Sequence, residues 1–185
     1  MNVRTHRIRV AMGLGAAVAA GALALSAAPA SASASSGYVS GAGSLYDDWD
    51  DEGTVSTTSK AKSNVSCLWQ RVLWAEGATE SNGTAYDLSD VDGVFGSNTA
   101  YATKKLQSRW GLTADGKVGK KTFTAAGNHL FDPKAVNYDS QRKYRLTYKG
   151  KSHIFYAYRS STGKWSFYDG NAKLRYAAYG YESCS

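Results

Sequence analysis

A repeated eight-residue phrase constrains this chain more than any other feature. The phrase Asp-Gly-x-Φ-Gly-x-x-Thr, in which Φ is apolar, starts at Asp92 and again at Asp115, twenty-three positions later. Asp can accept a hydrogen bond from its own backbone two residues on, and Gly reaches positive φ without a Cβ clash, so each Asp-Gly pair predicts a turn. The second Gly stands where a helix would begin. We therefore expect two similar turns, each leading into a helix.

Helical periodicity surrounds both copies of the phrase. Residues with 3–4 spacing mark one face before and between the copies: Val65, Leu68, Trp69, Val72 and Leu73, then Thr99, Ala102, Thr103, Leu106 and Trp110. Ser63 or Asn64 can cap the first helix, and Gly77 and Gly111 supply stops. A short third helix over residues 120–126 would end at Gly127. These signals predict a small three-helix module over residues 64–128.

Residues 64–128, about a third of the chain, resemble the peptidoglycan-binding domain of the first type, a three-helix module attached to many bacterial cell-wall hydrolases. The matching residues are Gln70, Leu73, Gly77, Asp92, Gly93, Phe95, Gly96, Thr99, Ala102, Gln107, Gly111, Leu112, Asp115, Gly116, Val118, Gly119 and Thr122. Trp69, Thr103 and Leu106 replace the Leu, Val and Phe of the family phrase, and the loop at residues 78–91 is longer than expected. The resemblance implies peptidoglycan binding without naming the contact residues.

Most motif residues have a structural explanation. We expect the two Asp-Gly pairs to form turns, and Phe95, Leu106 and Val118 to lie in the core. A ligand would then occupy a shallow groove made by loops and exposed helix residues. The candidate binding residues are Tyr101, Gln107, Arg109 and Trp110, together with the loop at residues 78–90. Trp110 also lies on the apolar face of its helix, which favours a core role for it.

The first 32 residues have the layout of a secretory signal peptide. Three arginines precede an apolar run at residues 10–25, and overlapping small-x-small sites end at Ala30, Ala32 and Ala34. The run is short and Gly-rich, and no charged stop follows it at once, which disfavours a transmembrane anchor. We expect cleavage between residues 30 and 34, a secreted protein that is extracellular or associated with the cell wall, and no stable membrane insertion after cleavage. We also expect a monomer.

Residues 33–63 are rich in Ser, Gly, Thr and Ala and show no repeating apolar face, which predicts a flexible acidic linker. Within it, five acidic residues surround Trp49. We favour a solvated acidic loop here. The alternative is a tether that docks on the basic C-terminal segment, with Trp49 as its anchor.

The apolar period changes from helical to two at Gln141. Alternating or apolar runs at residues 143–149, 154–158, 165–168 and 174–176 are separated by turn signals. They predict a four-strand antiparallel β meander in a basic, Tyr-rich segment at residues 137–185. Residues 130–136 are expected to form a connector, because Pro133 cannot donate a backbone hydrogen bond. The predicted fold class is therefore α+β, and so small a meander would either pack on the helices or rely on a disulfide.

The C-terminal segment also carries most of the positive charge. Residues 137–185 hold nine basic and three acidic residues, and nine of the thirteen tyrosines lie after residue 136. This excess predicts an anionic partner, such as teichoic acid or the carboxylates of peptidoglycan stem peptides. Tyrosines suit half-buried strands, but their rings can also stack on sugars. Secretion argues against nucleic acid.

Cys67 and Cys184 are the only cysteines. An even number in an exported chain favours a disulfide over two free thiols. The bond would close a loop of more than a hundred residues and join the C-terminus to the first helix, for a stabilisation of up to about 4–5 kcal/mol.

No catalytic constellation is visible in the sequence. Only His129 and His153 remain after the signal peptide, too few for a zinc site with about three protein ligands, and no G-x-S-x-G elbow occurs. Glu76, Glu80 and Glu182 could in principle serve a glycosidase, but they are interpreted as surface charge. We expect no metal and no cofactor. The favoured function is non-enzymatic peptidoglycan binding. The alternatives are a wall hydrolase with its site in the β segment, and an exported interaction or inhibitor protein that uses the helices as scaffold.

Overall fold

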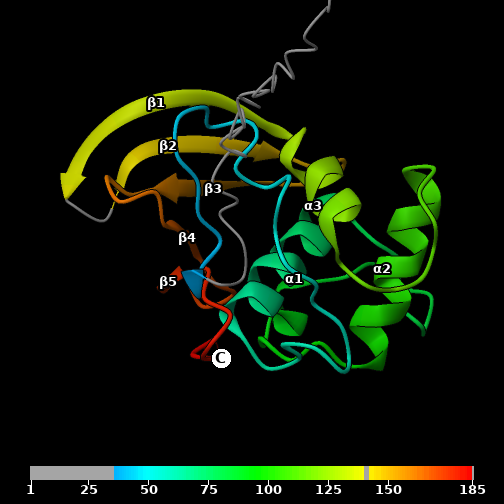
Figure 1. Cartoon of the computed structure of the whole chain (residues 1–185). Helices are drawn as coiled ribbons and strands as arrows, with labels where there is room; N and C mark the ends of the chain where they lie inside the picture. The colour runs from blue at the N-terminus through cyan, green and yellow to red at the C-terminus, as the bar shows by residue number, and fades with distance from the viewer. Residues whose placement is uncertain (1–35, 140–141, 185) are drawn as a thin grey trace, which may run out of the picture.

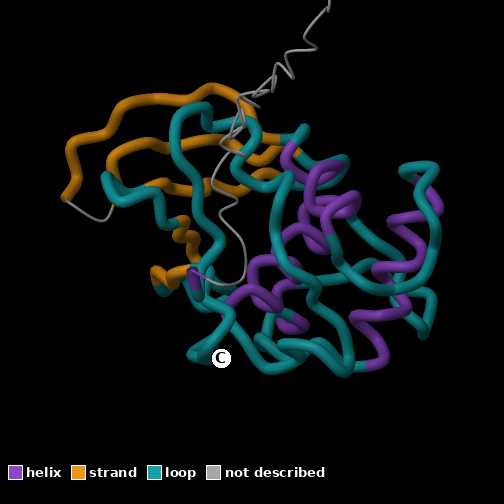
Figure 2. Tube along the Cα trace, viewed as in Figure 1, coloured by secondary structure: helices purple, strands orange, loops and turns teal. Residues whose placement is uncertain are grey.

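The computed structural model describes residues 36–139 and 142–184. The signal peptide predicted at residues 1–32, the first residues of the expected linker and Gln141 lie outside this range. In order, the elements are α1 (Asn64–Glu76), the 3-10 helix η2 (Leu88–Asp90), α2 (Ser97–Arg109), α3 (Lys120–Gly127), β1 (Leu130–Asp139), β2 (Arg142–Lys149), β3 (Ile154–Arg159), β4 (Trp165–Tyr168) and β5 (Leu174–Tyr176). Three α-helices precede one antiparallel sheet, which confirms the α+β class (Figures 1 and 2).

The helix ends follow the chemistry of the residues beside them. Ser63 caps α1, where its side chain accepts a hydrogen bond from the Ser66 N–H. Gly77 ends α1 in the left-handed conformation, at φ 55°. The second Gly of each repeated phrase precedes a helix, since Gly96 is the N-cap of α2 and Gly119 the N-cap of α3. No described helix is long and apolar enough to cross a membrane.

The sheet has five strands in sequential order, one more than expected. The additional strand is β1, so the expectation of a connector at residues 130–136 is wrong. Its pairing with β2 is interrupted between Phe131 and Lys134, where Asp132 has a φ of 53°. Pro133 therefore sits at an irregularity of an edge strand, where its missing N–H costs no ladder bond.

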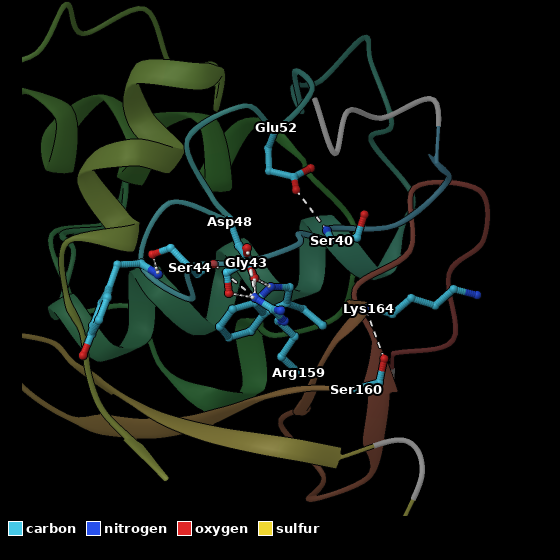
Figure 3. A network of polar contacts seen from close by, with 10 residues as sticks. Ser40, Gly43, Ser44, Asp48, Glu52, Arg159, Ser160 and Lys164 are labelled. Atoms are coloured by element: carbon cyan, nitrogen blue, oxygen red, sulfur yellow. Dashed lines mark hydrogen bonds and ion pairs between the residues drawn. The ribbon is translucent and has the colours of Figure 1, made fainter. Parts of the chain in front are cut away.

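The N-terminal segment, residues 36–63, packs on the molecule instead of extending as a solvated linker. Trp49 is 1% exposed, and its ring stacks on Tyr148 and meets Trp165 edge-on. Asp48, also buried, forms an ion pair with Arg159 of β3 at 2.9 Å (Figure 3). The solvated-loop interpretation is wrong for these two residues, because burying the Trp49 ring and pairing the Asp48 charge both require contact with the sheet.

The same segment also touches the repeated phrases. Val55 exchanges two backbone hydrogen bonds with Val118, and Phe95 donates its N–H to the Ala61 carbonyl. We call residues 36–63 the N-terminal strap, because they run from the sheet to both loops of the helical region.

Helices, strap and sheet share one core. Buried apolar residues of all three regions form a single cluster, which includes Trp49, Trp69, Phe95, Leu146 and Phe167. The predicted Cys67–Cys184 disulfide is confirmed, and it joins α1 to the last described residue of the chain. Glu76, at the end of α1, contributes a polar junction: its carboxylate contacts Arg109 of α2 at 2.6 Å and the Tyr148 hydroxyl of β2 at 3.2 Å.

Candidate functional site

The first repeated loop is held by one glutamine side chain. Gln70 of α1 accepts a hydrogen bond from the Gly93 N–H at 2.7 Å, and its amide nitrogen donates to Asp92 Oδ1 at 2.7 Å and to the Val94 carbonyl at 3.2 Å. Asp92 Oδ1 also accepts from the Val94 N–H. Gly93 has a φ of 78°, which its missing Cβ permits. The loop is therefore fixed on both sides of the Asp-Gly turn.

The second loop repeats this arrangement bond for bond. Gln107 of α2 accepts from the Gly116 N–H at 2.9 Å and donates to Asp115 Oδ1 at 3.0 Å, to the Lys117 carbonyl at 2.8 Å and to Thr122 at 3.1 Å. Burial raises the pKa of Asp115, but the hydrogen bonds from Lys117 and Gln107 and the Lys117 charge outweigh it and hold that pKa below its usual range. We call each such unit a glutamine clamp.

A cavity of about 250 Å³ opens beside each clamp. The first is lined by Gln70, Tyr86, Ser89, Asp90, Asp92, Val94, Gly96, Ser97, Asn98 and Thr99. The second is lined by Gln107, Leu112, Thr113, Asp115, Lys117, Gly119, Lys120, Lys121 and Thr122. The charged residues of the first are two carboxylates, whereas the second has three lysines and one carboxylate. The two cavities therefore match in position relative to the repeat and differ in charge.

The loop at residues 78–90 forms one wall of the first cavity. The Tyr86 hydroxyl shares a hydrogen bond with Thr99 at 3.1 Å, and burial raises the pKa of Tyr86 above its usual range. Asp87 and Asp90 cap the η2 turn reciprocally, so the wall is ordered by its own side chains. Burial also raises the pKa of Asp90.

The structure does not gather the four candidate binding residues into one place. Tyr101 is 36% exposed and lies under the Lys105 ammonium, whereas Gln107 is 1% exposed and its amide is used by the second clamp. Arg109 is tied to Glu76, and the half-buried Trp110 meets Trp69 edge-on. Of the four, only Gln107 lines either cavity.

Two carboxylates interpreted as surface charge are buried. Glu76 is 2% exposed and Glu80 is 6% exposed, while Glu182 is exposed. Glu80 accepts hydrogen bonds from Asn98 at 2.6 Å and from Thr84 at 2.7 Å, so its carboxylate holds the long loop to the start of α2. No group of three or more His, Cys, Asp or Glu side chains within the described ranges could hold a metal ion.

Most of the helical region matches a known protein family. Residues 72–126 match the family model described as "Putative peptidoglycan binding domain". The helical region is a domain of this family. Both Asp-Gly loops lie inside the matched range, as does Gln107, whereas Gln70 precedes it by two residues. Comparisons with curated proteins and with solved structures found no match.

Sequence reasoning missed the equivalence of the two glutamines in this peptidoglycan-binding domain. Both glutamines match the family phrase, but Gln107 is also a candidate binding residue, and the phrase does not relate one glutamine to the other. Each glutamine lies on the helix that precedes its loop, but the separations from the Asp differ, at 22 and 8 residues. The equivalence is therefore not visible as a fixed spacing, because the segments that join each helix to its Asp-Gly loop differ in length.

Proposed function

We propose that this protein is a secreted, non-enzymatic protein that binds the bacterial cell wall through peptidoglycan. The observation that carries the proposal is the family match over residues 72–126, in which both repeated loops are held by glutamine clamps beside open cavities. The signal-like N-terminus supports export, and the scarcity of catalytic side chains in the sequence supports a binding role.

We further propose that the two cavities are the peptidoglycan contacts. The carboxylates of Asp90 and Asp92 suit an ammonium group, and the lysines at positions 117, 120 and 121 suit a carboxylate. Peptidoglycan stem peptides carry groups of both kinds. We also include anionic wall polymers among the partners, because the C-terminal segment holds nine basic and three acidic residues.

Sedimentation with purified peptidoglycan tests the proposal. The secreted protein is mixed with walls stripped of accessory polymers across a salt series, and the bound fraction is measured. Binding that persists at high salt supports recognition by the helical domain, since simple charge attraction is screened. Absence of binding at every salt concentration refutes the proposal and favours an interaction or inhibitor protein, which pull-down of a soluble partner would identify.

A matched pair of variants tests the second cavity. Lys121→Gln removes a charge that lines the cavity, whereas Lys104→Gln removes an exposed charge on α2 that lines neither cavity. We expect only Lys121→Gln to weaken binding to stripped peptidoglycan, by about threefold to tenfold. Equal binding by both variants would remove the second cavity from the site. Loss of turbidity in a suspension of walls would instead identify a hydrolase.

A further inference from the structure

One face of the sheet is turned away from the core. Leu146 and Tyr148 of β2, with Phe155 and Ala157 of β3, are almost fully buried in the shared core. Because side chains alternate along a strand, the residues between them point to the opposite face. That face has no counterpart in the helical domain and lies outside the residues matched to the family.

Three apolar side chains on this face are exposed to solvent. Ile154 is 53% exposed, Phe131 is 48% exposed and Tyr156 is 40% exposed. Phe131 of β1 pairs with Thr147 of β2, which pairs with Tyr156 of β3, so the two rings lie in one row across three strands. Contacts among the described residues do not bury these two rings.

Cations alternate with the apolar side chains. Arg145 places its guanidinium 4.6 Å from the centre of the Tyr156 ring. Lys134 pairs with Arg145, and Lys149 pairs with Ile154, so both lysines lie on the same face. Asp132, beside Phe131, is exposed at the bulge of β1, but residues 142–168 contain seven Lys or Arg and no Asp or Glu. One of the seven, Arg159, is buried and paired with Asp48, but Lys134, Arg145 and Lys149 lie beside the exposed apolar side chains and give this face positive charge.

We propose that this face binds a phosphate-bearing glycopolymer of the cell wall. We call it the sheet platform and define it by Phe131, Lys134, Arg145, Lys149, Ile154 and Tyr156. A guanidinium stacked on a ring keeps its in-plane N–H groups available, and these match a phosphate group in bidentate geometry. Exposed rings beside it offer flat apolar surface to a sugar or polyol unit. A polymer that alternates sugar or polyol with phosphate satisfies both features.

The proposal deepens the partner class given under the proposed function and assigns it to a surface separate from the two cavities. The probe is a purified poly(glycerol phosphate) chain bearing sugars, titrated into the secreted protein. The test variant is the triple substitution Lys134→Gln, Arg145→Gln and Lys149→Gln. The matched control carries Lys60→Gln, Lys104→Gln and Lys173→Gln, which remove the same charge from exposed positions elsewhere.

We expect the test variant to bind the polymer about tenfold more weakly, or worse, with a flatter salt dependence, and the control to bind nearly as the unmodified protein does. Tyr156→Ala should weaken binding to the polymer but not to inorganic polyphosphate, which offers no sugar to the ring. Equal weakening by the control would mean that net charge alone attracts the polymer, and would overturn the proposal. Tighter binding to phosphatidylglycerol vesicles than to the polymer would overturn it as well.

Stripped peptidoglycan separates the two proposals. The test variant should still bind it, because the helical domain is untouched, and its urea midpoint should match that of the unmodified protein. Failure of every protein to bind stripped peptidoglycan would refute the proposed function but leave the polymer titration interpretable. Unchanged polymer binding by the test variant would refute the sheet platform alone.

Discussion

The helical domain and the sheet region are stabilised over different distances along the chain. The glutamine of each clamp bonds to residues 8 to 29 positions away, and both clamps use the same bonds, including one to Thr99 or Thr122. The sheet region is instead fastened to the N-terminal strap by contacts such as Arg159 to Asp48 and Tyr179 to Glu52, which are 111 and 127 positions apart. The helical domain is therefore stabilised by a repeated turn with partners nearby in the sequence, whereas the sheet region depends on polar contacts between residues far apart in the sequence.

The disulfide is the covalent tie between these two regions, and its loss should have the largest effect. Replacing Cys67 and Cys184 by Ala opens a loop with a sequence separation of 117 residues. We expect the free energy of unfolding in urea to fall by about 4–5 kcal/mol, chiefly because the unfolded chain gains entropy. A loss below about 1 kcal/mol would show that the shared core joins the regions without the bond.

Breaking the strap contact should affect the sheet region first. Asp48→Ala leaves the buried Arg159 guanidinium without its counter-ion and removes the acceptor of the Trp165 indole N–H. We expect a loss of about 3–5 kcal/mol, with hydrogen exchange rising in β3 and β4 before α2.

Asp47→Ala is the control for this substitution. Its carboxylate is exposed next to Asp48 in the sequence, so its removal should change stability by less than about 0.5 kcal/mol. Equal effects of the two substitutions would contradict a specific role for the Asp48–Arg159 pair.

The two glutamine clamps should contribute equally to the stability of the helical domain. Gln70→Ala and Gln107→Ala each leave a buried glycine N–H without its acceptor, at Gly93 and Gly116. Because the bonding is the same, we expect similar losses of about 1–3 kcal/mol each. Ser108→Ala, at an exposed position next to Gln107, serves as the control in the same urea titrations. Markedly unequal losses would mean that the two loops are not energetically equivalent.

The last expected effect depends on pH and concerns the strap. Glu52 is buried, hydrogen-bonded to Tyr179 and to the Ser40 N–H, and its burial raises the pKa from 4.5 to about 8 (Figure 3). The folded protein thus holds a proton that the unfolded chain releases. The contribution of this bound proton to the free energy of unfolding is complete below pH 4.5 and is lost as the pH rises to about 8. Over that range the free energy of unfolding falls by at most about 1.4 kcal/mol per pH unit.

Glu52→Gln keeps the shape of the side chain and removes this titration. We expect thermal unfolding of the variant to depend less on pH between 5 and 8, and the variant to be the more stable protein at pH 9. Parallel profiles for the two proteins would show that Glu52 does not hold the proton in the folded state.

The sequence by itself determined the helical domain. Asp-Gly turns, glycine helix stops and 3–4 apolar spacing act within a few residues, so the repeated phrase and the positions of α1, α2 and α3 could be read directly. An even number of cysteines, together with the expectation of export, also predicted the disulfide. Alternation at period two located four of the strands for the same reason, because it reflects which face of each strand is buried.

Only the tertiary structure decided the roles of side chains whose partners lie far away. Strand β1 was not predicted because it contains Pro133, and whether a strand tolerates a proline depends on its hydrogen bonding to the neighbouring strand. The acidic run around Trp49 was interpreted as solvated because the sequence does not show that Asp48 pairs with Arg159 and accepts a hydrogen bond from Trp165. The sequence does not show that the Gln107 amide is bonded to the loop that follows it, or that Glu76 and Glu80 are buried through partners on other elements. Burial and hydrogen-bond partners are properties of the folded chain, and local sequence patterns do not specify them.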